Sequence, residues 1–430
     1  MTGHKIYNLA KKLFPINRSL TGNGVVSTLK ELKKINSLIK ILYFPSNKKV
    51  FDWKVPLEWN IKNAWVKVDG RKIIDFKDHN LSLVGYSIPV NKKINFSELN
   101  KHLYSIPKQQ NAIPYITSYY NKAWGFCLKH SERVKLDKKK IYHVFVDSEL
   151  KKGKMHYGEI LIPGKSKKEI FFSTYICHPS MANNELSGPT MLIFLSKWIK
   201  KLKNRHYSYR IIFIPETIGS IAYLSKNFRN MKKNVVAGYN VTCVGDEGNF
   251  SYLPSRNGNT FSDQVAVHVL NKYVKTYNKY LWLNRGSDER QYCSPGINLP
   301  VASIMKSKYE KYPEYHTSLD NLENLVSAKG LNESFEIYKK IVLQIENSDF
   351  YQQTNYCEPF LTRHGLYPTI NQKNQNNKKI SLIMNFLSYC DGKNNFIEIV
   401  RKCKSTLKEL NPIVKELLKK KIIKKNKFPI

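Results

Sequence analysis

Several features that would assign this chain to a class at once are missing from its 430 residues. The seven cysteines are dispersed and never form a C-x-x-C pair, which argues against a disulfide framework and against a cysteine-based structural zinc cluster. No run approaches the roughly 18–20 apolar residues of a membrane helix. Residues 1–12 lack the apolar centre of a secretory signal. We therefore expect a cytoplasmic protein with reduced thiols and no membrane span.

Acidic residues are also scarce. The chain has 33 Asp and Glu against 71 Lys and Arg, a formal net charge of +38. Such an excess is compatible with an anionic partner, but the lysines are spread along the whole chain rather than gathered in one stretch. We interpret them as a solvated surface and expect no nucleic-acid partner.

A phosphate-binding loop is missing as well. Residues 15–24 contain two glycines between helical segments at 4–14 and 26–40, but not the G-x-G-x-x-G pattern. The loop serves as a turn that opens the second helix, and Arg18 within it could still face a site.

Three regions of different character follow one another. Short strand-like runs with prolines and many aromatic residues occupy residues 49–130, and we expect a small β-rich domain inserted there. Residues 1–48 and 131–350 form the main domain, where strands and helices alternate. This alternation predicts an α/β fold with a mixed, mostly parallel sheet flanked by helices. After a linker at residues 371–377, three helical segments and a basic hairpin in 375–430 predict a small module like a winged helix.

In the main domain, several buried strands end in a polar residue. His178 follows the apolar run 171–176, Glu216 follows 211–214, Asp246 follows 241–244, and His316 lies in a turn after 301–305. Ligands in open α/β sheets bind at the carboxyl ends of strands. A single histidine there is most simply a strand cap. Two histidines and a carboxylate from separate strands, however, are the ligands of a hydrolytic zinc site, and a nearby free carboxylate would be its general base.

The order of these motifs resembles the superfamily of zinc aminopeptidases and carboxypeptidases with co-catalytic zinc ions. The stretches C-H-P-S-M-A-N-N-E-L-S-G (177–188) and P-E-T-I-G-S-I-A-Y-L (215–224) resemble more closely a bacterial branch of aminopeptidase-like proteins associated with polysaccharide biosynthesis. That resemblance implies an inserted β-rich domain, a C-terminal winged helix, zinc as cofactor and Glu216 as the general base.

Two positions depart from the superfamily pattern. Asn184 stands where the superfamily has the aspartate that bridges two metal ions, and Thr217 stands where it has a second glutamate. A neutral amide bridges two dications poorly. We therefore predict one Zn²⁺ rather than two, held by His178, Asp246 and His316, with Asn184 or the adjacent Glu185 as a further ligand.

The predicted function is cleavage of an amide or peptide bond in a peptide or small amide-bearing substrate. Arg285 or Arg290 is placed to bind a substrate carboxylate, although a solvated charged loop is an equal alternative. A second hypothesis is a catalytically altered protein that binds a metal or a ligand in surface polysaccharide biosynthesis. The protein could also form a homo-oligomer, which the sequence does not decide.

Overall fold

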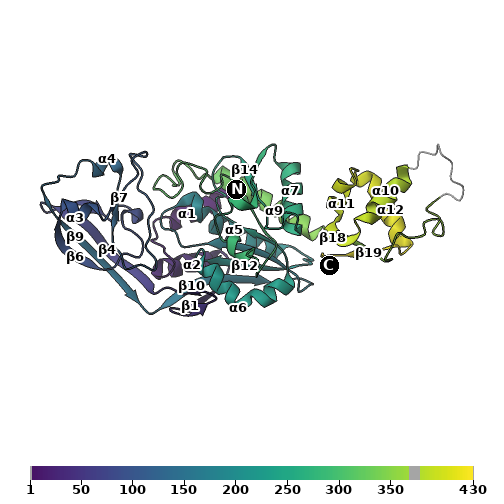
Figure 1. The fold of residues 1–430 in the computed structure, drawn as a ribbon, viewed down its shortest axis with the longest axis horizontal. Coiled ribbons are helices and arrows are strands. Elements are labelled where there is room, and N and C mark those ends of the chain that lie inside the picture. Colours follow the sequence, from purple (N-terminus) through teal and green to yellow (C-terminus); the bar gives the residue numbers. More distant parts are fainter. Residues whose placement is uncertain (1, 368–377, 430) are drawn as a thin grey trace.

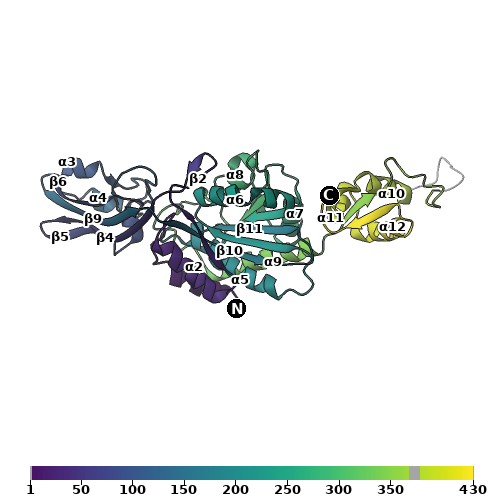
Figure 2. The same cartoon turned by 90° about the horizontal axis from the view of Figure 1, so that it is seen from below.

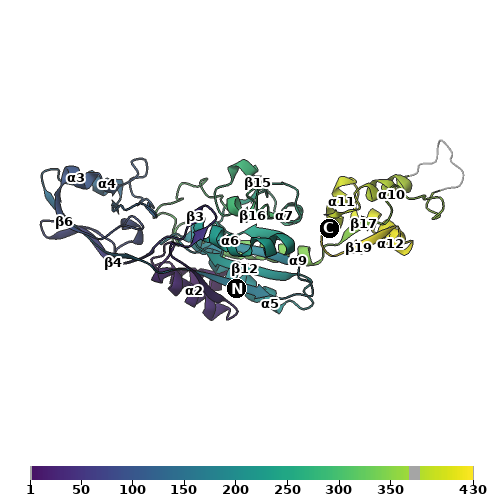
Figure 3. The same ribbon diagram turned by 60° about the horizontal axis from the view of Figure 1, so that its bottom comes forward.

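The computed structural model describes residues 2–367 and 378–429, and it arranges them as three parts in a row (Figure 1). The inserted β-rich part lies at one end, the α/β core in the middle and the C-terminal module at the other end (Figures 1 and 3). The predicted linker at 371–377 lies outside the described residues.

The core contains an eight-stranded mixed sheet. Parallel pairing joins β12 to β11, β11 to β13 and β13 to β16 in its centre, while antiparallel strands flank them on both sides. In spatial order the strands are β1 (Lys40–Pro45), β10 (Lys154–Ile162), β12 (Ser208–Ile214), β11 (Glu169–Tyr175), β13 (Val235–Asn240), β16 (Val301–Met305), β14 (Phe250–Leu253) and β15 (Tyr277–Lys279). The prediction of a mixed, mostly parallel α/β sheet is confirmed.

Helices cover both faces of this sheet, with α2 and α5 on one side and α6 and α8 on the other (Figure 2). The central strands are apolar almost throughout because alternate side chains enter different cores. In β11, Ile170 and Phe172 join one hydrophobic cluster, and Phe171 and Tyr175 join the other. The helices are α1 (Thr2–Leu13), α2 (Asn23–Ile35), α5 (Ser187–Lys201), α7 (Phe261–Tyr273) and α9 (Ala328–Glu346) on the first cluster, and α6 (Ile218–Asn234) and α8 (Glu289–Tyr292) on the second.

The insertion is built on a four-stranded antiparallel sheet in the order β5-β4-β9-β6. Its last strand in sequence, β9 (Ile141–Lys151), pairs with both β4 and β6, so the inserted sheet extends past the predicted limit at residue 130. The other elements of the insertion are β4 (Glu58–Val68), β5 (Arg71–Asp75), β6 (Val90–Asn95), α3 (Phe96–Asn100), β7 (Leu103–Tyr104), β8 (Phe126–Cys127) and α4 (His130–Arg133). The preceding hairpin of β2 (Lys49–Val50) and β3 (Trp53–Lys54) lies against the core, where Phe51 packs on Phe228 of α6 (Figure 2).

The C-terminal module has its own small hydrophobic core. Three helices pack on a three-stranded antiparallel sheet in which β17 lies between β18 and β19. The elements are β17 (Phe350–Gln353), α10 (Lys378–Ser388), β18 (Asp391–Asn395), α11 (Phe396–Lys402), α12 (Leu407–Lys419) and β19 (Ile423–Asn426). Among the described residues, no helix combines the length and apolarity needed to cross a membrane.

Candidate active site

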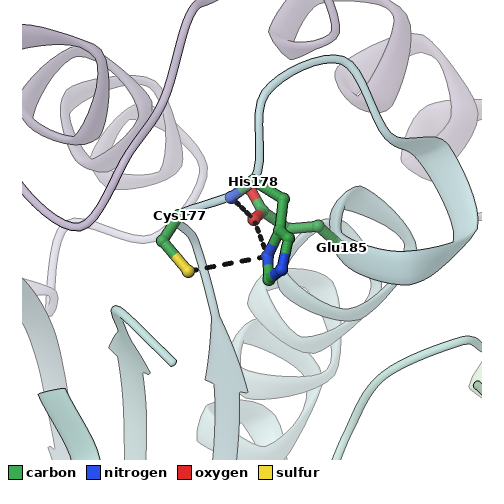
Figure 4. Close-up of side chains that lie close together, drawn as sticks. All are labelled: Cys177, His178 and Glu185. Carbon is green, nitrogen blue, oxygen red and sulfur yellow. Dashed lines mark hydrogen bonds and ion pairs between the residues drawn. The ribbon is translucent and has the colours of Figure 1, made fainter. Parts of the chain in front are cut away.

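His178 lies directly beyond the carboxyl end of β11 and is 2% exposed. Its Nδ1 lies 3.1 Å from Glu185 Oε2, and the His178 backbone N–H donates to the same oxygen, as Figure 4 shows. Cys177 Sγ lies 3.5 Å from Nδ1. Because Nδ1 is engaged, Nε2 is the ring nitrogen left to face a ligand.

Arg18 neutralises Glu185. Its Nε donates to Glu185 Oε1 at 2.7 Å, and neither side chain is exposed. The guanidinium also donates to the backbone oxygens of Leu13, at 2.7 Å, and His178, at 3.1 Å. Both carboxylate oxygens of Glu185 are therefore engaged. This arrangement favours Glu185 as the group that orients His178 over the metal ligand that the sequence suggests as one option.

Asn184 lies in the turn η2 (Ala182–Leu186), a single turn of π-helix between β11 and α5. Such turns are frequent at functional sites. The Asp320 carboxylate fixes this turn by accepting hydrogen bonds from the backbone N–H groups of Ala182, Asn183 and Asn184. Asp320 of the predicted H-T-x-x-D motif thus holds the loop that carries Asn184.

Gly188 permits this loop to approach the sheet closely. A Cβ at residue 188 would lie 2.4 Å from Thr174 Oγ1 and 2.5 Å from the backbone oxygen of Val241. Both distances are far below van der Waals contact, so any larger residue would push α5 away from the strand ends.

Glu216 follows β12 and faces His178, with Oε2 3.6 Å from Nε2. Its Oε1 accepts a hydrogen bond of 2.7 Å from Ser287 Oγ. Burial raises the pKa of Glu216, although His178, Ser287 and Arg290 act in the opposite direction. A carboxyl group with a raised pKa at the edge of a site suits proton transfer at neutral pH.

The residue after Glu216 is held in a strained conformation. Thr217 has φ 60° and ψ −78°, which β-branched residues rarely adopt. Its backbone N–H donates to Asp288 Oδ1 at 2.7 Å, and Ser220 Oγ donates to the same oxygen at 2.9 Å. Burial, followed by the charge of Glu216, raises the pKa of Asp288 to about 8. The strain turns the Glu216 peptide toward the loop of Ser287 and Asp288.

His316 lies in a turn beyond β16, with its ring centroid 5.5 Å from that of His178. Tyr315 stacks on it at 3.9 Å. The buried Nε2 of His316 has no hydrogen-bond partner among the described residues. Burial, followed by the charge of His178, lowers the pKa of His316 to about 3. A neutral imidazole with an unpartnered nitrogen is the form that binds a metal ion.

The structure does not bring Asp246 together with the two histidines. Its carboxylate accepts hydrogen bonds from Asn183 Nδ2 at 2.8 Å, from the Gly248 N–H at 2.7 Å and from the Ser307 hydroxyl at 2.8 Å. In the described ranges, the one group of three close His, Cys or carboxylate atoms able to hold an ion is Cys177, His178 and Glu185, and Asp246, Glu216 and His316 lie outside it. Glu216 and His316 nevertheless lie beside His178, for which no contact with Asp246 is found in the described part of the chain. The position of Asp246 therefore corrects the expected ligand set.

Thr242 occupies the place beside Asn184 instead. The Tyr175 hydroxyl donates to Asn184 Oδ1 at 2.6 Å and also contacts Thr242 Oγ1. Sequence reasoning missed Thr242, Tyr175 and Ser287. The sequence could have indicated Thr242, because this residue lies two positions beyond the end of β13, where site residues are expected.

The two candidate substrate-binding arginines lie differently. Arg290 Nε donates to the Ser287 backbone oxygen at 3.1 Å, and its Nη2 lies 3.4 Å from Thr217 Oγ1, so it borders the site. Arg285 is exposed and packs over the Trp282 ring at 5.0 Å. Only Arg290 has contacts that place its charge near Glu216.

The free donors at these strand ends are of the kinds that bind a metal ion such as Zn²⁺. Glu185, Asp246 and Asp320 use their carboxylate oxygens to hold the surrounding loops. Asp288 uses Oδ1 in the same way, whereas its buried Oδ2 has no partner among the described residues. Glu216 keeps one oxygen facing His178 Nε2, and His316 Nε2 is unpartnered. The two imidazoles would hold a Zn²⁺, and Glu216 would remain an unligated carboxylate beside it.

Solved structures of zinc aminopeptidases share this fold. The zinc aminopeptidase BSAP from Bacillus subtilis matches with a TM-score of 0.58 over 80% of this chain and 94% of its own, at 12% identity. An aminopeptidase from Aneurinibacillus sp. strain AM-1 matches with a TM-score of 0.52 over 80% and 93%, at 14% identity. The core therefore has an aminopeptidase-like fold.

Family models and more similar proteins identify the family of this chain. Residues 7–348 match the family model described as "Domain of unknown function (DUF4910)", and residues 349–425 match a winged helix-turn-helix model. The chain belongs to this DUF4910 family. A Clostridium acetobutylicum protein, provisionally named a polysaccharide biosynthesis protein with an aminopeptidase-like domain, is 43% identical over 93% of this chain and 92% of its own length. A crystal structure from the same organism, provisionally named a peptidase, has a TM-score of 0.83 at 40% identity over 99% of this chain and 97% of that one. The predicted resemblance and the C-terminal winged helix are both confirmed.

Proposed function

We propose that this chain is a zinc-dependent, aminopeptidase-like hydrolase that cleaves an amide or peptide bond. The observation that carries the proposal is the arrangement around His178. Its Nε2 lies 3.6 Å from Glu216 Oε2, and its ring centroid lies 5.5 Å from that of His316, whose Nε2 is unpartnered among the described residues. Asn184 Oδ1 lies at the same strand ends, but its hydrogen bond from Tyr175 makes it a weaker ligand. One ion is proposed for this site.

The protein residues have separable tasks in this reaction. His178 and His316 would hold the ion, and Glu185 with Arg18 would keep the His178 ring in place. The chemistry supplied by bound zinc is polarisation of a carbonyl and acidification of water. Glu216 accepts the proton of the attacking water at Oε2 and returns it to the departing nitrogen, while Ser287 holds Oε1. Arg290 is placed to bind an anionic group of the substrate.

Metal analysis together with one substitution tests the proposal. Purified wild type is expected to contain one equivalent of zinc, and His178→Ala and His316→Ala are expected to contain little. Glu216→Gln should keep the metal and lose hydrolysis of a panel of aminoacyl p-nitroanilides by about 10²- to 10⁴-fold. A wild type without stoichiometric metal, or a fully active Glu216→Gln, would refute the proposal.

A second candidate is a catalytically altered protein that binds a metal or ligand in surface polysaccharide biosynthesis. It is favoured by the neutral side chains of Asn184, Thr217 and Thr242 around the site and by the name of the Clostridium relative. This candidate predicts metal binding with no turnover. Metal-dependent release of amino acids from a peptide library would exclude it.

We also infer that the protein works in a reducing compartment such as the cytoplasm. The seven cysteines are all free, and five of them are buried. Thiol labelling of the protein purified without reductant tests this inference, because seven labelled residues are expected after unfolding.

A further inference from the structure

A segment of the insertion joins the edge of the candidate site. We call residues 109–119 the strap. The Tyr115 N–H donates to the His316 backbone oxygen at 2.9 Å, and the Ser318 N–H donates to the Ile113 oxygen at 2.9 Å. Ser318 Oγ accepts from the Ile113 N–H at 2.9 Å. The strap therefore pairs with the turn that carries His316, although about 200 residues separate them in sequence.

The strap places a tyrosine against both histidines. The centroid of the Tyr115 ring is 5.1 Å from that of His178 and 5.2 Å from that of His316. Together with Tyr315, which stacks on His316, it gives the site an aromatic wall. Figure 2 shows that the insertion otherwise lies to one side of the core.

A second tyrosine orients the first. The hydroxyl groups of Tyr115 and Tyr119 are 2.8 Å apart. Tyr119 packs edge-on against Tyr86, and the Tyr86 hydroxyl bonds to Thr21 Oγ1 at 2.7 Å. Either phenol can be the donor in this bond. When Tyr119 donates to Tyr115, the Tyr115 O–H stays free to donate to another acceptor.

We propose that Tyr115 is a substrate-contacting residue, supplied by the insertion, whose hydroxyl donates to the carbonyl oxygen of the scissile amide. This inference rests on the proposed hydrolase function and adds the residue that holds the carbonyl. The geometry favours it because Tyr115 is the hydroxyl-bearing side chain whose ring packs on both His178 and His316. A fixed donor at that oxygen stabilises the negative charge that develops on it during attack.

The test compares conservative tyrosine variants. Tyr115→Phe removes the hydroxyl and keeps the ring, and Tyr119→Phe removes its hydrogen-bond partner. Tyr120→Phe is the matched control. Tyr120 directly follows Tyr119, is 49% exposed and donates its hydroxyl to the Lys54 backbone oxygen. All variants are examined for zinc content, melting temperature and hydrolysis of the aminoacyl p-nitroanilide panel. The cobalt-loaded proteins are titrated with L-leucine hydroxamate by visible absorption.

Tyr115→Phe should keep its zinc and lose about 10²-fold in kcat/KM, mostly in kcat. Its hydroxamate Kd should rise about five- to tenfold. Tyr119→Phe should show a smaller loss, and Tyr120→Phe should stay within about twofold of wild type, as expected for a residue outside the site. Equal kinetics and probe binding in Tyr115→Phe and Tyr120→Phe would overturn the inference, as would loss of zinc or of folding in Tyr115→Phe. If the proposed function itself is wrong, the wild type will neither hydrolyse the panel nor bind the probe. That result is distinct from a failure of the Tyr115 inference alone, and it would overturn the Tyr115 inference as well.

Discussion

Arg18→Met is the substitution whose effect follows most directly from the structure. Arg18 and Glu185 are both fully buried, and their pair is 2.7 Å long. Removing one partner of such a pair leaves an uncompensated buried charge, which costs about 3–5 kcal/mol. At about 2–4 °C per kcal/mol, the melting temperature of the core should fall by roughly 6–20 °C. The zinc affinity should fall as well, because Glu185 would no longer be fixed against His178.

The assay is scanning calorimetry of the full chain, with Lys12→Met as the matched control. Lys12 pairs with Glu31 at 2.6 Å, but its side chain is 58% exposed. Such a surface pair contributes about 0–1 kcal/mol, so this variant should melt within about 4 °C of wild type. Arg18→Met combined with Glu185→Gln should regain part of the loss, since no charge is left unpaired. If Arg18→Met were no less stable than Lys12→Met, the assignment of Arg18 as the counter-ion of Glu185 would be refuted.

Two further substitutions test the surrounding groups. Asp288 has its pKa raised to about 8 by burial, and a carboxyl whose folded pKa exceeds its unfolded value destabilises the fold as pH rises from about 4 to 8. Asp288→Asn should therefore gain stability relative to wild type across that window, by about 2 kcal/mol or more at pH 8.5; a pH-independent difference would contradict this. Asn184→Asp should tighten zinc binding by about tenfold through the added charge, yet keep one equivalent, since Thr217 and Thr242 remain neutral. Competition with a chelator measures the zinc affinity, and elemental analysis measures the zinc content. Two equivalents of zinc would contradict this prediction, because they would show that one added carboxylate restores a second metal-binding position.

The sequence predicted the centre of the fold well and its borders less well. β11 and β12 are buried over all but their first residue and are mostly apolar, as expected for strands covered on both faces. The range 131–350 was predicted to belong to the main domain, but β9 within it alternates buried and partly exposed residues and pairs with the strands of the insertion. That alternation is typical of an antiparallel sheet with one solvated face, so the period of the pattern was the signal that separates the two sheets.

The site shows a similar division. The sequence proposes His178, Glu216 and His316 because each belongs to a specific motif beyond a strand, and the structure places the three residues near one another. Asp246 lies beyond a stretch of irregular chain after Asn240, where the residue that faces the site depends on the local backbone. Cys243 has φ 51°, and this reversal cannot be inferred from residue types. The Arg18–Glu185 pair joins residues 167 positions apart, a distance that no local pattern specifies.

Helix α1 packs against helix α9, which is synthesised much later, and this contact limits the order in which a nascent chain can fold. The Gly3 N–H donates to Asn332 Oδ1 across 329 positions, and the Tyr7 hydroxyl donates to the Leu322 oxygen. At about 5–20 residues per second, helix α1 waits roughly 15–65 s on the ribosome before its partner helix α9 emerges. The inserted sheet, whose strands pair with one another, can form during that delay. Helix α1 meanwhile lacks its contact with α9, so a segment synthesised more than 300 residues before α9 is completed only after α9 has emerged.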